Sequence, residues 1–127
     1  MLNATPLLRL YSHWRLRKLA QMDPVDVQQR LLLGLVGRAS RTSFGRDHDF
    51  SNIRSVTGFQ KRVPLRRYED FNERYWKKAF PDLRGVSWPS AVPFFAVTSG
   101  TTTGRTKYIP CTHEMVASNT AASLDLM

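Results

Sequence analysis

A short polar segment, residues 98–107, lies between two apolar runs and combines hydroxyl side chains, two glycines and two cations. Its order is Thr98, Ser99, Gly100, Thr101, Thr102, Thr103, Gly104, Arg105, Thr106 and Lys107. The glycines let the backbone turn its amides inward, the hydroxyls supply neutral donors, and a cation offsets negative charge. This composition suits a loop that binds a polyphosphate. An ordinary hairpin turn is the alternative that composition leaves open.

The position of the lysine indicates what flanks this loop. A Walker loop places lysine immediately after its second glycine, whereas Lys107 comes three residues after Gly104. We therefore expect a strand, a loop and a second strand in place of a strand followed by a helix. The strands are expected at residues 94–97 and 107–109.

Helices are expected before this segment. Asp23 can accept the free amides of a first helical turn and Pro24 presets the backbone angle there, which predicts a helix to about residue 40. Residues 42–55 are rich in small polar residues without a sustained period, so we expect a loop, with Phe44 and Phe50 anchored in the core.

Two further helices follow from spacing. A short one is expected at residues 56–62, because the residue before Pro64 is disfavoured in helical geometry. The next is expected to run to about residue 80 and to bury one face, formed by Tyr68, Phe71, Tyr75 and Ala79.

Residues 81–93 contain three prolines and a glycine and are expected to form an irregular connection. After the second strand, Thr112 can cap a final helix that has Glu114 in its first turn, where the helix dipole favours negative charge. The apolar pattern of residues 117–127 has no closing signal, and we interpret it as a truncated helix.

The chain is strongly basic, with 19 lysines and arginines against 10 acidic residues and a net charge of +9. This charge favours anionic partners such as nucleic acid, anionic membranes or phosphate-bearing substrates. Residues 1–22 contain no acid and predict a basic amphipathic helix that begins at Thr5 and Pro6 and lies over the domain. A transit peptide and a membrane-surface helix are the alternatives.

At residues 98–107 the chain resembles the phosphate loop of the acyl-adenylate-forming superfamily, whose pattern runs Thr/Ser, Ser, Gly, Thr, Thr/Ser, a small residue, Gly, two variable residues, Lys. Much of that superfamily has proline where this chain has Thr106. Further blocks resemble one branch, the auxin-responsive acyl acid amido synthetase family. These blocks are TSFGRDHDF at 42–50, FQKRVPLRRYEDF at 59–71 and FFAVTSGTTTGRTKYIP at 94–110.

The resemblance implies an α/β fold in which amino-terminal helices pack beside the first strands of a large adenylate-forming domain, here truncated. Its start would occupy residues 23–127, after the helix at 1–22. The implied enzyme adenylates a carboxylic acid with ATP and Mg²⁺ and then conjugates the acyl group to an amine such as an amino acid. These 127 residues alone are expected to be inactive.

Carried over by position, ATP phosphates would be contacted by Thr98, Ser99, Gly100, Thr101 and Thr102. Gly104 would permit the turn, and Lys107 would hold the loop or neutralise charge. Whether Arg105 or Lys107 faces the phosphates stays open. The resemblance identifies no catalytic residue and no metal ligand in this chain.

Other polar residues are better explained by structural roles than by a binding site. His48 lies between two aspartates but is expected in a solvated turn, because a short loop supplies too few convergent metal ligands. The basic residues Lys61, Arg62, Arg66 and Arg67 could form a nucleic-acid patch. We expect instead that Phe59, Val63 and Leu65 face the core while these bases stay in water.

The sequence thus predicts an ATP-dependent acyl-activating enzyme whose partners are a small carboxylic acid and an amine, with no nucleic acid. The alternative is a small basic binding module for nucleic acid or an anionic membrane surface. No apolar run approaches the roughly 18 residues that span a bilayer, so no stable membrane insertion is expected. The lone Cys111 favours a reducing compartment, and we expect the cytoplasm.

Overall fold

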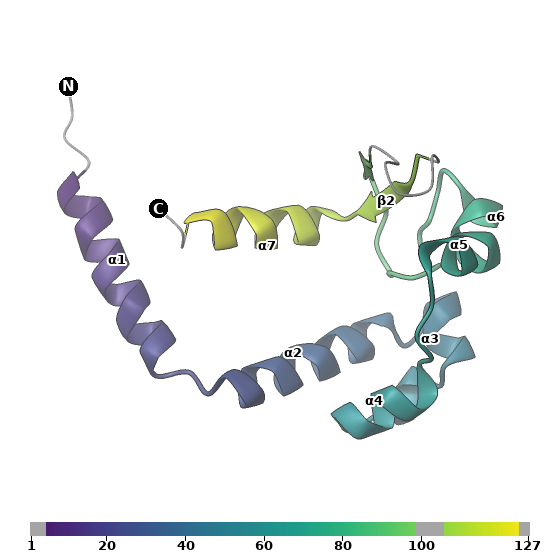
Figure 1. Cartoon of the computed structure of the whole chain (residues 1–127), viewed down its shortest axis with the longest axis horizontal. Coiled ribbons are helices and arrows are strands. Elements are labelled where there is room, and N and C mark those ends of the chain that lie inside the picture. Colours follow the sequence, from purple (N-terminus) through teal and green to yellow (C-terminus); the bar gives the residue numbers. More distant parts are fainter. Residues whose placement is uncertain (1–4, 99–105, 125–127) are drawn as a thin grey trace.

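The computed structural model describes residues 5–98 and 106–124, and within them the chain has the expected α/β composition. Figure 1 shows α2 leading from α1 to a group of short helices, and α7 running back from the strands toward α1. The elements are α1 (Thr5–Ala20), α2 (Pro24–Ala39), α3 (Ser43–Asp47), η1 (Phe50–Asn52), α4 (Val56–Arg62), α5 (Tyr68–Phe71), η2 (Asn72–Trp76), α6 (Lys77–Ala79), β1 (Phe94–Val97), β2 (Tyr108–Cys111) and α7 (His113–Leu124).

Local capping sets the helix starts that the sequence predicts. Asp23 Oδ1 accepts hydrogen bonds from the amides of Val25, at 2.8 Å, and Asp26, at 3.3 Å, so α2 begins at Pro24 as expected. Helix α4 has the expected bounds, and its Ser55 cap accepts from the Gly58 amide at 3.0 Å. Both helix predictions are confirmed.

The core lies where the carboxyl-terminal half of α2 meets the segments that follow it. Val36, Ala39, Phe50 and Ile53 are buried there, and the partly buried side chains around them are Leu32, Leu33, Phe44, Phe59, Val63 and Trp88. The rings of Phe44 and Phe50 meet edge to face, 5.5 Å apart. The prediction that these two phenylalanines anchor their segment in the core is therefore confirmed.

The prediction of a loop at residues 42–55 is wrong, because α3 and η1 lie within it. The buried Thr42 caps α3 by accepting from the Gly45 amide at 3.0 Å, while its own hydroxyl donates to Ala39 O at 2.7 Å. The amides of Ser43 and Phe44 donate to the carbonyls of residues 85 and 86, at 2.8 and 2.9 Å. Backbone partners some 40 positions away therefore stabilise α3, whose sequence has no sustained hydrophobic period of its own.

Two side chains near this corner differ from expectation. His48 is buried and not solvated: its Nδ1 lies 2.9 Å from Arg62 O, and its ring meets the edge of Phe44 at 4.6 Å. Leu65, expected in the core, is fully exposed. It lies between α4 and α5, where the chain leaves the core.

The helix expected at residues 68–80 forms as three consecutive pieces, α5, the π-helical turn η2, and α6. Its predicted face is confirmed, because Tyr75 is buried while Tyr68, Phe71 and Ala79 are partly buried. The irregular connection after it includes the fully buried Leu83. Gly85 has a φ of 71°, a left-handed conformation that favours glycine.

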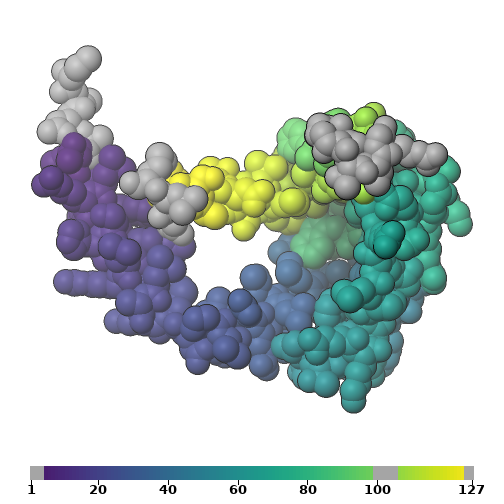
Figure 2. Space-filling model, viewed as in Figure 1, coloured from purple at the N-terminus to yellow at the C-terminus, as the bar shows by residue number. Residues whose placement is uncertain are grey.

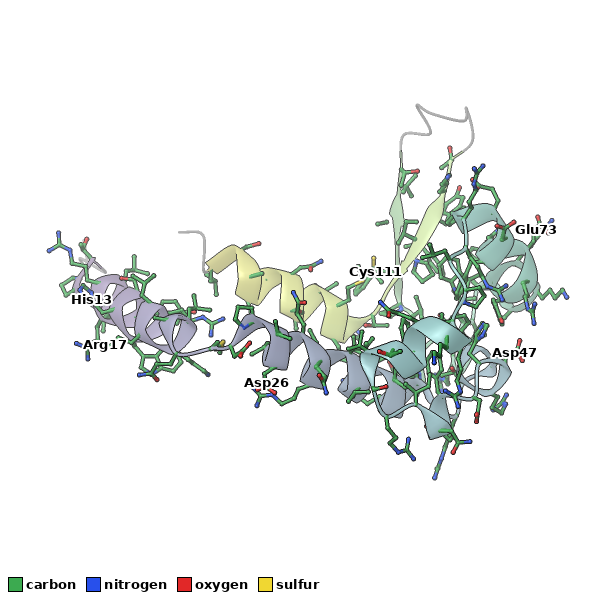
Figure 3. The ribbon with its side chains drawn as sticks, turned by 60° about the horizontal axis from the view of Figure 1, so that its bottom comes forward. His13, Arg17, Asp26, Asp47, Glu73 and Cys111 are labelled. Atoms are coloured by element: carbon green, nitrogen blue, oxygen red, sulfur yellow. The ribbon has the colours of Figure 1, made fainter. Side chains whose placement is uncertain are left out.

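The amino-terminal helix forms over residues 5–20, but the expectation that it lies over the domain is wrong. Its large apolar side chains are exposed, with Leu7, Leu10 and Leu16 each more than 60% accessible. Figure 3 shows His13 and Arg17 of α1 at one end of the molecule and Glu73 at the other. Among the described residues, no helix is long and apolar enough to cross a membrane.

Candidate functional site

The predicted phosphate loop connects two antiparallel strands. Strands β1 and β2 pair from Phe94 with Cys111 to Val97 with Tyr108, so residues 98–107 join their adjacent ends. The Thr98 amide donates to Lys107 O at 3.1 Å, and the Lys107 amide donates to Thr98 Oγ1 at 3.4 Å. The two expected strands are confirmed, with β2 at 108–111 and not 107–109, while the loop predicted between them lies largely outside the described residues.

The described residues include both ends of the proposed site. Thr98 and Lys107 face each other across the loop's base. Ser99, Gly100, Thr101, Thr102 and Gly104 lie outside the described residues, as does Arg105.

The Lys107 side chain is engaged by the first turn of α5. Its Nζ lies 2.8 Å from Glu69 Oε1 and 5.2 Å from the centre of the Tyr68 ring. The hydrogen bond from Lys107 lowers the pKa of the Glu69 carboxyl, so the carboxylate stays charged at neutral pH. Sequence reasoning placed Tyr68 only on a buried face and did not single out Glu69, because nothing local indicates a partner 38 positions away.

The hydroxyl of Tyr68 also binds the backbone of β2. It accepts from the Tyr108 amide at 3.0 Å and donates to Tyr108 O at 3.3 Å. These backbone groups of Tyr108 would otherwise be open positions on the edge of the strand. The first residue of β2 is thus attached to α5 directly after the loop.

A cavity of about 650 Å³ opens between the hairpin and the segment from α5 to α6. Trp76, Phe80 and Phe95 contribute to its apolar lining, while Glu73 and Lys77 form an ion pair at 2.8 Å beside it. Thr106 and Lys107 also line this cavity, so it lies next to one end of the loop.

Helix α7 is fixed to the rest of the chain near its first turn. Glu114 accepts a hydrogen bond from Trp88 Nε1 and forms an ion pair with Arg38 of α2, each at 2.6 Å. The hydrogen bond from Trp88 is the main cause that lowers the pKa of the Glu114 carboxyl. The Met115 amide donates to Thr112 Oγ1 at 3.1 Å, which confirms the predicted cap. In the space-filling view an opening separates the rest of α7 from α2 (Figure 2).

The basic residues at 61–67 do not form a uniformly solvated patch. Arg62 lies 3.6 Å from Asp49, and Arg66 is half-buried with its guanidinium 5.9 Å from the centre of the Tyr75 ring. The expectation that the bases stay in water is therefore wrong for Arg66. Over residues 5–98 and 106–124, no group of three or more His, Cys, Asp or Glu side chains could hold a metal ion.

Comparison with known families gives one finding. Residues 15–126 match the model described as the GH3 family N-terminal domain. No curated protein and no solved structure gives a significant match. The family match covers both strands, the loop between them, and the Tyr68 and Glu69 contacts at its base.

Proposed function

The chain belongs to the GH3 family, the family of auxin-responsive acyl acid amido synthetases, and we propose that it contributes the ATP-phosphate loop of such an enzyme. The observation that carries this proposal is the hairpin, whose strand ends hold a loop of hydroxyl residues and glycines by two hydrogen bonds between Thr98 and Lys107. These two bonds hold Thr98 and Lys107, the ends of the proposed phosphate loop, next to each other.

The proposed reaction has two steps. A carboxylate oxygen attacks the α-phosphorus of ATP, and the bond to pyrophosphate breaks. An amine then attacks the acyl carbon, AMP leaves with the bonding electrons, and the amine loses a proton. The first step requires two anions to be held together while phosphoryl charge is stabilised, a task suited to a loop of neutral donors.

The described residues fit part of the implied ligand set. Thr98 Oγ1 accepts from the Lys107 amide and retains a hydroxyl proton that can be donated to a phosphate oxygen. Mg²⁺ would supply charge neutralisation on the phosphates when bound as the nucleotide complex. Because the described residues include no group of metal ligands, we derive no step through it.

The loop hydroxyls provide the test. In the full-length enzyme, Ser99→Ala and Thr101→Ala should each slow carboxylate-dependent exchange of pyrophosphate into ATP, measured over a panel of acyl acids. Loss of one phosphate donor costs on the order of 1–3 kcal/mol, which corresponds to roughly a 5- to 150-fold slower exchange.

Matched controls are available in α7. Ser123 and Thr120 donate their hydroxyl protons to carbonyls one helical turn earlier, at 2.9 and 3.0 Å. Ser123→Ala and Thr120→Ala should leave the exchange rate unchanged. If Ser99→Ala and Thr101→Ala behave like these controls, the loop does not bind the phosphates.

Helix α1 supports a second candidate function, a basic module that binds nucleic acid or an anionic membrane surface. Arg9, Arg15, Arg17 and Lys18 lie on it with no acidic residue and with exposed leucines. Such binding would weaken steeply with salt and would be indifferent to ATP. Protection of residues 98–107 by ATP in hydrogen exchange would favour the enzyme instead.

A further inference from the structure

The Lys107 ammonium, a candidate for neutralising phosphate charge, is already occupied. The Lys107 side chain is 27% exposed, and its Nζ lies 2.8 Å from a carboxylate oxygen of Glu69 and over the ring of Tyr68. To reach a phosphate it would have to leave both partners. Such a lysine suits a role in holding the loop rather than in meeting the nucleotide.

The partners of Lys107 are themselves supported. The Tyr68 ring lies 5.9 Å from that of Trp76, and Trp76 Nε1 donates to Ser87 Oγ at 3.0 Å. The same Tyr68 hydroxyl makes two hydrogen bonds to the backbone of Tyr108. Tyr68 of α5 therefore binds β2 at Tyr108, the residue that follows the loop, and the Trp76 ring packs against the Tyr68 ring.

We infer that Tyr68 and Glu69 are positioning residues that clamp the second end of the phosphate loop, and that Lys107 anchors the loop to α5 instead of contacting phosphate. This inference rests on the proposed function for its effect on ATP. The clamp itself is a property of the hairpin and can be measured without nucleotide. If Lys107 is only an anchor, the loop needs opposite charges at positions 69 and 107 and does not need the positive charge to be at 107.

The geometry supplies a matched control one turn along. Glu73 pairs with Lys77 at 2.8 Å, the same distance as Glu69 and Lys107, but both residues lie within the helical segment. Glu73→Gln therefore removes an ion pair of equal length without touching the hairpin. Effects shared by Glu69→Gln and Glu73→Gln would reflect helix stability and not the loop.

The test uses the full-length protein carrying Tyr68→Phe, Glu69→Gln, Glu73→Gln or the exchanged pair Glu69→Lys with Lys107→Glu. One readout is hydrogen exchange of the Thr98 amide, which bonds to Lys107 O and not to Tyr68. The other is the dissociation constant for ATP with Mg²⁺. We expect roughly tenfold faster exchange for Tyr68→Phe, two- to fivefold for Glu69→Gln, and no change for Glu73→Gln.

The exchanged pair separates the two roles of Lys107. Restoration of wild-type exchange and ATP affinity supports the anchor, because only the attraction between the two side chains is then required. Restored exchange with lost ATP affinity shows that Lys107 contacts phosphate and overturns the anchor role. Unchanged Thr98 exchange in Tyr68→Phe and Glu69→Gln overturns the clamp. A wild-type protein that binds no ATP, while both variants exchange faster, supports the clamp and refutes the proposed function.

Discussion

Gly45 should not tolerate a side chain, because α3 passes against the carboxyl end of α2 at this residue. A Cβ built on Gly45 would lie 2.0 Å from Ala39 O and 2.9 Å from Ala39 C. Backbone atoms cannot rotate away as a side chain can, so the two helices must separate. Gly45 also belongs to the block TSFGRDHDF, and this close approach gives a physical reason for glycine there.

The cost follows from what Ala39 O already does. It accepts from the Thr42 amide at 3.0 Å and from the Thr42 hydroxyl at 2.7 Å, and moving it strains both bonds. Overpacking costs about 1–3 kcal/mol and a lost hydrogen bond about 1 kcal/mol, so Gly45→Ala should lower the free energy of unfolding by about 2–4 kcal/mol.

Gly34 provides the control, because a Cβ there would meet nothing within 4 Å. It lies on an exposed position of α2, where alanine should stabilise the protein by about 0.5–1 kcal/mol. Urea unfolding of both variants measures the midpoint and its slope, and only the midpoint should move. If Gly45→Ala is as stable as Gly34→Ala, the described packing of α3 on α2 is wrong.

Two further predictions concern the aromatic cluster beside α3. Phe71→Ala should destabilise the protein by about 2–3 kcal/mol, less than a fully buried ring would, because Phe71 is half-buried against Trp76 and Tyr75. In urea unfolding, a change below about 0.5 kcal/mol would show that this face is not packed. Hydrogen bonds from Tyr75, at 2.9 Å, and then Arg74 lower the pKa of Asp47. The stability from Asp47 is therefore present above about pH 4, the ordinary value, and is lost as pH falls through its lowered pKa. Asp47→Asn should reduce the dependence of the unfolding free energy on pH below about pH 4. An unchanged pH dependence would contradict the hydrogen bonds of Asp47 with Tyr75 and Arg74.

Short-range signals let the sequence determine several elements of this protein by itself. A cap and a proline act within one helical turn, so Asp23 and Pro24 start α2 whatever lies around them. The same holds for the bounds of α4 and for the cap at Thr112. Apolar flanks around a polar segment likewise predicted the two strands, although the second begins one residue later than expected, and their antiparallel pairing was seen only in the structure.

Tertiary structure decided the features whose partners lie far apart in the chain. Residues 43–47 became helical against carbonyls at 85 and 86, and His48 was buried by Phe44 and the end of α4. Lys107 met Glu69 only because the hairpin lies against α5. No local pattern encodes such pairs, since the energy of an ion pair or buried ring depends on distance in space and not on spacing in the sequence.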